Sequence, residues 1–300
     1  MKSSSSAVQG DFAGSDRPFA MTTFGSTADK ALKALARSWQ LERRRVLRDP
    51  APEAIHRLRT AARRLEAAGR ITTDQFGLTA SLPWHDWDSL NSKLSRLRDL
   101  DVTRQILRES RFEGQPNNEV LRQRLEELAR ERKRARRRAV TELERHRSGR
   151  IVRRVARLAS RLSPPADLAV AARSWWALGG ETVTIDPVLR QSLAPTLRRQ
   201  AGRAAVHEIR IRLRNLRYGL EWWSDLGLVV SPPVVGFLRD AQDTLGRIRD
   251  CQRTATALAG PGLRRFRSAV VAARRIEIAR WPSVAERGDL LGASPFEGIP

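Results

Sequence analysis

The stretch IHRLRTAARRLEAAGRIT at residues 55–72 and the stretch VHEIRIRLRNLRYGLEWW at residues 206–223 share one pattern. In each stretch a histidine is followed by arginines three and seven residues later, and the two histidines are 151 residues apart. The segments LSRLRDLDVTRQIL, from Leu94, and LGRIRDCQRTATAL, from Leu245, are also 151 residues apart. Because two different motifs recur at one offset, the sequence predicts a tandem internal repeat of one structural unit.

Each histidine motif predicts an amphipathic helix. At about 100° per residue, Arg59, Arg63 and Arg70 lie within about 60° of His56, and leucines and alanines lie on the opposite side. The second copy has the same basic stripe, formed by His207, Arg210, Arg214 and, further round, Arg217. Like charges one helical turn apart repel each other, and acidic residues are nearly absent from both stripes. The stripes therefore predict one surface that binds an anion; the alternative is an exposed basic helix face without a ligand.

The charge of the whole chain indicates the same kind of partner. The chain has 300 residues, enough to bury a sizeable core, and a formal net charge of +23. Such an excess attracts polyanions, namely nucleic acids, anionic membrane faces and inorganic phosphate polymers. The alternative, that arginine only supplies a general surface charge, does not account for the regular spacing of the stripes.

Three features of the sequence bear on the cellular compartment of the protein. Cys251 is the only cysteine, which excludes an intramolecular disulfide, and its counterpart Leu100 in the first copy predicts that Cys251 is buried. No stretch approaches the ~20 apolar residues of a membrane-spanning helix, and the serine-rich start lacks the apolar segment of a secretory signal. We therefore expect a cytoplasmic protein without membrane insertion.

The organisation of the chain is helical almost throughout, because apolar residues recur every three or four positions. This pattern predicts an all-α protein with a first half-bundle at 27–163, a linker around Trp175 and Trp176, and a second half-bundle at 186–281. Polar, Ser- and Gly-rich segments predict disordered tails at 1–26 and 282–300. The expected helices are one carrying His56, one from about Pro83 to Arg108, and others at about 27–47, 119–161, 187–203, 204–224, 232–258 and 262–281.

The second repeated motif places an aspartate beside an arginine, as Arg98–Asp99 in the first copy and Arg249–Asp250 in the second. Both copies also share a basic residue two positions before that arginine, Arg96 and Arg247. An aspartate among so many cations most simply orients arginine side chains through paired hydrogen bonds. We therefore expect these aspartates to have a structural role within the basic surface.

The residue types that metal binding and catalysis need are missing from these motifs. The four histidines form no i,i+4 pair and have no carboxylate at metal-ligand spacing. Asp101 is replaced by Gln252 in the second copy, which argues against a paired-carboxylate acid–base site. The sequence also has no phosphate-binding loop, nucleophile elbow or zinc-protease motif. Phosphoryl transfer needs acidic residues to hold magnesium, and the stripes share none. We expect binding without a metal, a cofactor or turnover; an enzyme acting on phosphate polymers is one rival.

The runs HRLRTAARRL at 56–65, RLRDLDV at 96–102 and RNLRY at 214–218 resemble the CHAD domain, the conserved histidine α-helical domain, over about residues 27–281. The resemblance implies two four-helix bundles related by pseudo-two-fold symmetry, with a basic central cavity that binds inorganic polyphosphate. It implies that the binding residues are His56, Arg59, Arg63, Arg64, Arg98, His207, Arg210, Arg214, Arg217 and Arg249. Glu208, Asn215 and Gln252 depart from the family pattern, so we expect the first half to contribute more charge.

A second group of bases extends the predicted site, formed by Arg57, Arg70, Arg96, Arg132, Arg136 and Arg247. We expect a non-enzymatic polyphosphate-binding protein, with polyphosphate granules as a candidate location, in which arginine side chains grip successive phosphates. The other rival partner is nucleic acid. Tyr218, Trp222 and Trp223 are the aromatic residues near the stripe, but both tryptophans border the apolar face and are expected in the core.

Overall fold

The computed structural model describes residues 21–75, 84–109, 119–145, 150, 152–155, 157, 168–180, 196–197, 200–292 and 294–296. Its helices are α1 (Met21–Arg48), α2 (Pro52–Gln75), α3 (Trp84–Glu109), α4 (Glu119–Glu144), α6 (Leu168–Gly180), α9 (Gln200–Asp225), α10 (Pro232–Ala257), α11 (Arg264–Ala285) and the 3₁₀ helix η2 (Glu286–Gly292). The described residues contain no strand beyond one antiparallel bridge between Val230 and Phe296. The prediction of an all-α protein is confirmed.

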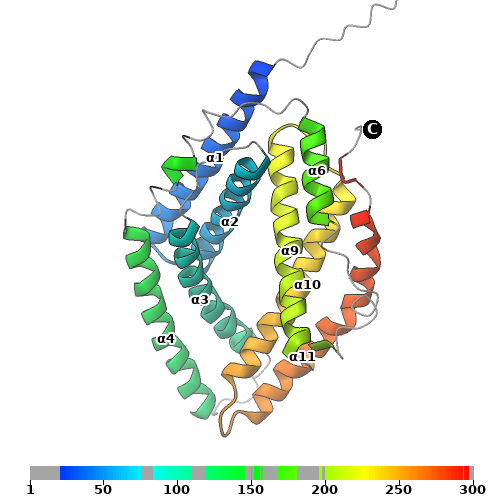
Figure 1. The fold of residues 1–300 in the computed structure, drawn as a ribbon. Helices are drawn as coiled ribbons and strands as arrows, with labels where there is room; N and C mark the ends of the chain where they lie inside the picture. The colour runs from blue at the N-terminus through cyan, green and yellow to red at the C-terminus, as the bar shows by residue number, and fades with distance from the viewer. Residues whose placement is uncertain are drawn as a thin grey trace, which may run out of the picture.

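The helices form two groups that face each other (Figure 1). In the first group α1 packs on α2 and α3 packs on α4, whereas in the second group α9 and α11 both pack on α10. Between the groups, α2 packs against α9 and α3 packs against α10. These four helices carry the repeated motifs, so equivalent helices of the two copies meet where the groups join. The pseudo-two-fold relation between the copies stays a prediction.

The apolar face of each histidine helix is buried, as the helical wheel predicts. Leu58, Ala62 and Leu65 of α2 have no exposed surface, and Leu213 and Leu216 of α9 are buried as well. Burial of one leucine side chain stabilises the fold by roughly 1.5–3 kcal/mol. This burial fixes the rotation of each helix about its axis, and therefore fixes the direction in which the opposite, basic face points.

Tryptophans occupy the centres of both groups. Trp39 of α1 and Trp87 of α3 are fully buried and pack against each other with tilted rings whose centroids are 5.4 Å apart. Trp222 and Trp223 are also buried, which confirms the core assignment over the stacking alternative. Cys251 is a buried free thiol, as predicted.

The segment around Trp175 and Trp176, which was predicted as a linker between the copies, forms the helix α6. Trp175 packs on Gly219 of α9, where an added Cβ would overlap the indole ring, and its ring centroid lies 6.1 Å from that of Trp223. The glycine allows this close approach. The segment ends in two glycines and is short, which favoured a linker, but its apolar residues find a partner surface on α9.

The predicted disorder of residues 282–300 is wrong for 282–292 and 294–296. The helix α11 continues through Pro282 to Ala285, and η2 follows directly and packs on α10 and α11. Leu291 and Phe296 are buried, and the Ser231 N–H donates to the Pro295 carbonyl at 2.7 Å. Glycine, serine and proline separate these two apolar anchors, which is why the sequence pattern did not reveal them.

Three other boundaries differ from the prediction. The helix α1 begins at Met21, inside the predicted tail 1–26, and earlier residues lie outside the described part of the chain. The helix α9 runs without a break from Gln200, because Gly202 is tolerated in its first turn. The helix α4 ends at Glu144, and most of its expected continuation to residue 161 lies outside the described residues.

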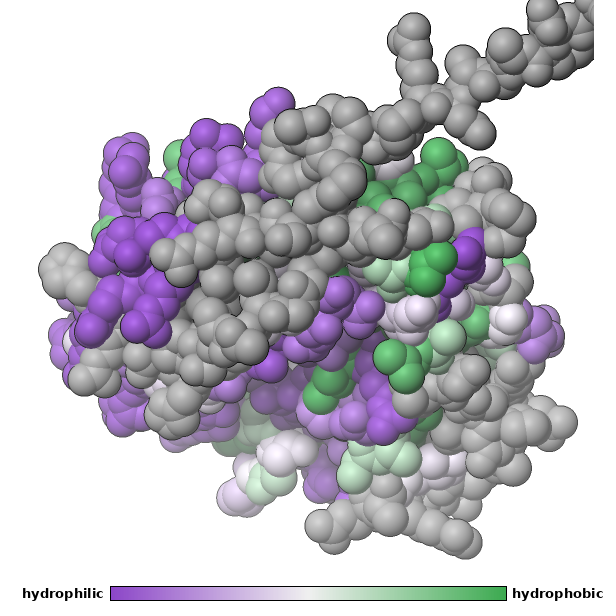
Figure 2. Space-filling view, turned by 45° about the horizontal axis from the view of Figure 1, so that its top comes forward, coloured by the Kyte–Doolittle hydropathy of each residue, from purple (hydrophilic) through white to green (hydrophobic). Residues whose placement is uncertain are grey.

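The outer surface of the first group is strongly hydrophilic. Figure 2 shows hydrophilic residues gathered on the left side of the molecule, where Figure 1 places α1 and α4. In the described part of the chain, no helix is long and apolar enough to cross a membrane.

Candidate functional site

The two basic stripes converge on one region between the helix groups. The charge of Arg63 on α2 acts on three arginines of the second half, Arg210 and Arg214 on α9 and Arg249 on α10. On the first half, the charge of Arg98 on α3 acts on His56 of α2. The structure therefore brings together residues that are far apart in the sequence and places their positive charges within reach of one another.

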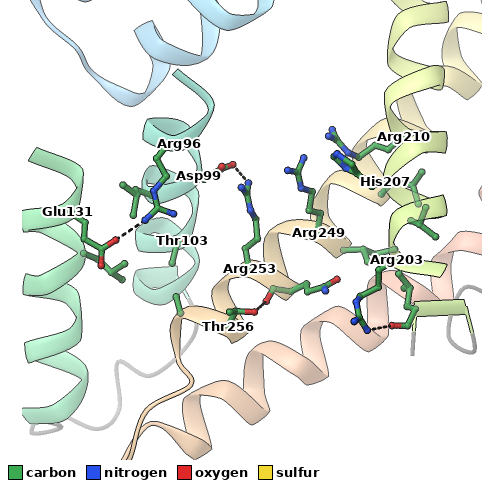
Figure 3. A pocket seen from close by; sticks show the side chains of 18 of the residues that line it. Arg96, Asp99, Thr103, Glu131, Arg203, His207, Arg210, Arg249, Arg253 and Thr256 are labelled. Carbon is green, nitrogen blue, oxygen red and sulfur yellow. Dashed lines mark hydrogen bonds and ion pairs between the residues drawn. The ribbon is translucent and has the colours of Figure 1, made fainter. Parts of the chain in front are cut away.

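A cavity of about 630 Å³, which we call the central groove, lies between α3, α4, α9 and α10. Its charged and polar lining comprises Arg96, Asp99, Thr103, Arg124, Glu131, Arg203, His207, Arg210, Arg249, Gln252, Arg253 and Thr256. Figure 3 shows the side chains of Arg249, Arg253, Arg210 and His207 directed into this space from α9 and α10. The central groove is therefore a basic cavity built mainly from the second copy, with one wall from the first.

A second, smaller cavity of about 440 Å³ continues the basic surface beside α6. Arg63, Arg70 and Arg214 line it together with Glu66 and Asp74. Because the charge of Arg63 also acts on Arg210 and Arg249 of the central groove, the stripe joins the two cavities.

The arginines of the stripes are crowded and partly buried. Burial, followed by the charges of Arg63 and Arg98, lowers the pKa of Arg59 to about 9. Burial, followed by the charges of Arg249, Arg214 and Arg63, lowers the pKa of Arg210 to about 9 as well. The guanidinium groups stay charged at neutral pH, so the free protein holds like charges together at an energetic cost that a bound anion would offset.

The same positive field acts on both histidines. Partial burial lowers the pKa of His56, and the charges of Arg98 and Arg59 lower it further. Partial burial and the charges of Arg249 and Arg210 lower the pKa of His207. Each ring is therefore mostly neutral at pH 7, and the neutral ring retains one N–H that can donate a hydrogen bond.

Polar contacts hold the stripe arginines in place without neutralising them. Within the described residues, the bases at the centre of the site form no ion pair: His56, Arg59, Arg63, Arg98, His207, Arg210, Arg214 and Arg249. Arg59 donates to the Ser95 hydroxyl at 3.3 Å, and Arg214 donates to the Asn215 side-chain oxygen at 3.1 Å. The Nε of Arg210 is buried and has no hydrogen-bond partner among the described residues. The site thus holds donors that remain available to a ligand.

The two motif aspartates lie within this basic region. Asp99 of α3 forms an ion pair with Arg253 of α10, so it joins the two helix groups (Figure 3). Burial and the nearby charge of Asp99 raise the pKa of Asp250. The expectation that the aspartates orient arginines holds for Asp99, although its partner is Arg253 and not the adjacent Arg98.

Several predicted residues lie away from the central groove and have acidic partners of their own. Arg64 and Arg217 both pair with Glu221 at 3.0 Å, and Arg57 pairs with Glu42 at 3.2 Å. Arg217 also lies over the ring of Tyr218, 4.4 Å from its centroid. Glu42 reaches Arg57 and Glu221 reaches Arg64 from neighbouring helices, which the pattern of a single helix does not show. For Arg217 the acid lies on α9 itself, because Glu221 follows it by one helical turn.

Some bases of the second predicted group line the two cavities, and others lie elsewhere. Arg96 lines the central groove and pairs with Glu131 at 2.9 Å, and Arg70 pairs with Glu66 at 3.0 Å in the smaller cavity. Besides Arg57, described above, three lie elsewhere: Arg247 pairs with Glu277, Arg132 pairs with the buried Asp101, and the exposed Arg136 lines neither cavity.

Three arginines of the central groove were not predicted from the sequence, namely Arg124, Arg203 and Arg253. Arg203 lies four residues before His207, and Arg253 lies four residues after Arg249. Residues four apart share a helix face, so extending each motif by one helical turn could have found these two. Arg124 is on α4, outside both repeated motifs, and no local pattern marks it.

Comparison with known proteins agrees with this geometry. The CHAD domain family matches residues 30–259. The chain belongs to the CHAD domain family. The CHAD domain from the plant Ricinus communis has a similar fold, with a TM-score of 0.68 and 19% identity over 91% of this chain and 93% of that chain.

PptA from Streptomyces chartreusis also has this fold, with a TM-score of 0.60 and 23% identity over 89% of this chain and 99% of that chain. A search of curated proteins found no match. The recognition of a CHAD domain from the histidine and arginine motifs is thus confirmed, and the extent of the match spans both helix groups.

Proposed function

We propose that this CHAD protein binds inorganic polyphosphate in the central groove and along the adjoining stripe, without turning it over. The observation that carries the proposal is the set of bases from both halves that converge there and form no ion pair within the described residues. The resemblance to CHAD domains, which implies polyphosphate as the ligand, supports the same conclusion. The proposal places the protein in the cytoplasm, with polyphosphate granules as its candidate location.

The mechanism of binding is electrostatic. Arginine presents a planar set of donors that matches phosphate oxygens, and each contact releases condensed counterions from the polymer. Arg63, Arg210 and Arg249 provide such donors across the junction of the groups, and their mutual repulsion decreases when phosphates lie between them. His56 and His207 each add one N–H donor at close range.

A bare phosphate chain fits this site better than a nucleic acid. Nucleic-acid sites without sequence preference use exposed aromatic rings on which bases stack. Trp222 and Trp223 are buried, and Tyr218 is only 5% exposed beneath Arg217. The stripe region therefore offers phosphate contacts without a stacking platform of these residues.

Competition binding tests the proposal. Fluorescent long-chain polyphosphate is bound to the full chain in EDTA at physiological salt, and unlabelled polyphosphate, duplex DNA and single-stranded DNA are added at equal phosphate concentration. The proposal predicts binding in EDTA, because it needs no bridging metal, and displacement by polyphosphate at far lower concentration than by either DNA. Equal displacement by DNA would favour a nucleic-acid-binding protein.

A further inference from the structure

A third cavity, which we call the α3–α4 groove, has a volume of about 480 Å³ and lies between α3 and α4. It is lined by Ser92, Lys93, Arg96, Glu131, Arg134, Ala135 and Arg138. Lys93 pairs with the buried Glu142, but Arg134 and Arg138 are exposed and form no ion pair within the described part of the chain. This groove therefore presents two guanidinium groups that pair with no described acidic side chain.

The α3–α4 groove is continuous with the central groove. Arg96 and Glu131 line both cavities, and their ion pair of 2.9 Å bridges α3 and α4 at the edge of the central groove (Figure 3). Arg134 follows Glu131 by one turn of α4, and Arg138 follows by a second turn, a spacing of about 6 Å between the two arginines along the helix axis. Bases therefore continue from the central groove past the shared wall onto α4.

We propose that the α3–α4 groove is a second binding segment for the same phosphate polymer. Long chains lie in the central groove, cross the Arg96–Glu131 pair and contact Arg134 and Arg138, whereas short chains occupy the central groove alone. A polyphosphate carries negative charge at every repeat. A longer chain can therefore contact more bases along a continuous basic surface, and its affinity increases with its length. The proposal rests on the proposed function and assigns a basis for chain-length preference to residues of α4.

The ion pair between Arg96 and Glu131 at the shared wall weakens phosphate binding where the two grooves join. Among the described residues, Glu131 is the only acid that lines the α3–α4 groove, and it also reaches Arg124 at 3.5 Å. Its carboxylate opposes a phosphate that crosses the wall and occupies donors of Arg96 that the phosphate could otherwise use. Neutralising Glu131 should therefore favour long chains, an effect opposite in sign to loss of the arginines.

The experiment compares inorganic tripolyphosphate with a long-chain inorganic polyphosphate in EDTA, on the full chain. The double substitution Arg134→Gln and Arg138→Gln should lower the affinity for the long chain roughly tenfold, and lower the salt slope by about 0.7 per arginine removed. Tripolyphosphate affinity should not change. Glu131→Gln should raise the affinity for the long chain more than that for tripolyphosphate.

The matched control is Lys133→Gln with Arg136→Gln, which removes two exposed charges from the same helix at positions that line neither groove. Its affinity for the long chain should stay within about twofold of the unsubstituted protein. An equal loss in the control, or an equal loss for tripolyphosphate and long chain, would overturn the second segment. If the unsubstituted protein binds neither phosphate polymer, the proposed function itself fails.

Discussion

Burial and the positive charge of Arg63 on α2 lower the pKa of Arg214 on α9 to about 10, although these equivalent positions of the repeat are 151 residues apart. Two like charges held close together in a partly buried site destabilise the free protein. An anion placed between them reverses the sign of that interaction.

Asp99 moderates the charge of the central groove, since it pairs with Arg253 and also lies near Arg59 and Arg249. We expect Asp99→Asn to tighten polyphosphate binding and to steepen its salt dependence, because one negative charge leaves the groove and Arg253 gains free donors. The same change should cost about 1 kcal/mol of unfolding free energy, the upper range for a partly exposed pair. Titrations at several salt concentrations and urea unfolding measure the two effects. Weaker binding with unchanged stability would contradict this reading.

We expect polyphosphate binding to depend on pH because of the two histidines. Their pKa values lie below 6.5 in the free protein, and bound phosphate favours the protonated form, so affinity should rise as the pH falls from about 7.5 to about 5.5. The stability of the free protein should change in the opposite direction. Below pH 6.5 the unfolded chain takes up protons before the folded chain does, so stability decreases with acidification.

The control for this prediction is His56→Gln with His207→Gln, which keeps a donor at each position without a titrating group. The double variant should bind polyphosphate with a flatter pH profile over the same range. Other groups titrate in the site, notably Asp250, whose pKa is raised. If the variant keeps the full pH dependence of the unsubstituted protein, the histidines are not its source.

We expect substitution of Arg132 to change the stability of the fold without changing polyphosphate binding. It pairs with Asp101, which is only 5% exposed, and also donates to the Pro50 carbonyl at 3.3 Å. Arg132→Met should lower the unfolding free energy by about 3–5 kcal/mol, because a buried carboxylate loses its partner. Polyphosphate affinity of the folded protein should not change. The double variant with Asp101→Asn should recover much of the stability, as measured by thermal unfolding.

The fold was largely predictable because the repeat and the apolar periodicity are local properties of the chain. The bounds of α2, α3 and α10 follow from prolines and from stripes of leucine. The family can be recognised from motifs as short as RLRDLDV. What the sequence did not reveal depends on tertiary partners. The segment LAVAARSWWALGG forms a helix because α9 offers Gly219 beneath Trp175, and residues 286–292 are ordered because Leu291 and Phe296 are buried.

The convergence of bases in the candidate site was predictable where it follows from a residue's face on one helix. Arg59, Arg63, Arg210 and Arg214 point away from the apolar face and meet at the junction. Arg64 and Arg132 were misplaced, because their acidic partners Glu221, Asp225 and Asp101 come from other helices. Periodicity identifies which face is basic, but not which bases an acid from another helix will neutralise.

Charge reversal in the stripe is the most direct test of polyphosphate binding at the junction of the helix groups. Arg63→Glu with Arg214→Glu places two negative charges where the stripes meet, away from the apolar face of either helix. The matched control is Arg264→Glu with Arg267→Glu on α11, two exposed arginines that line neither groove and produce the same change in net charge.

The measurement is the dissociation constant for long-chain polyphosphate at physiological salt, with circular dichroism as a check that helicity is unchanged. The account predicts that the stripe variant loses about a hundredfold or more in affinity, because two charge-assisted contacts are replaced by repulsion, while the α11 variant loses only a few-fold. If both variants lose the same affinity, bulk charge is the cause of binding and the convergent site at the junction of the helix groups is not.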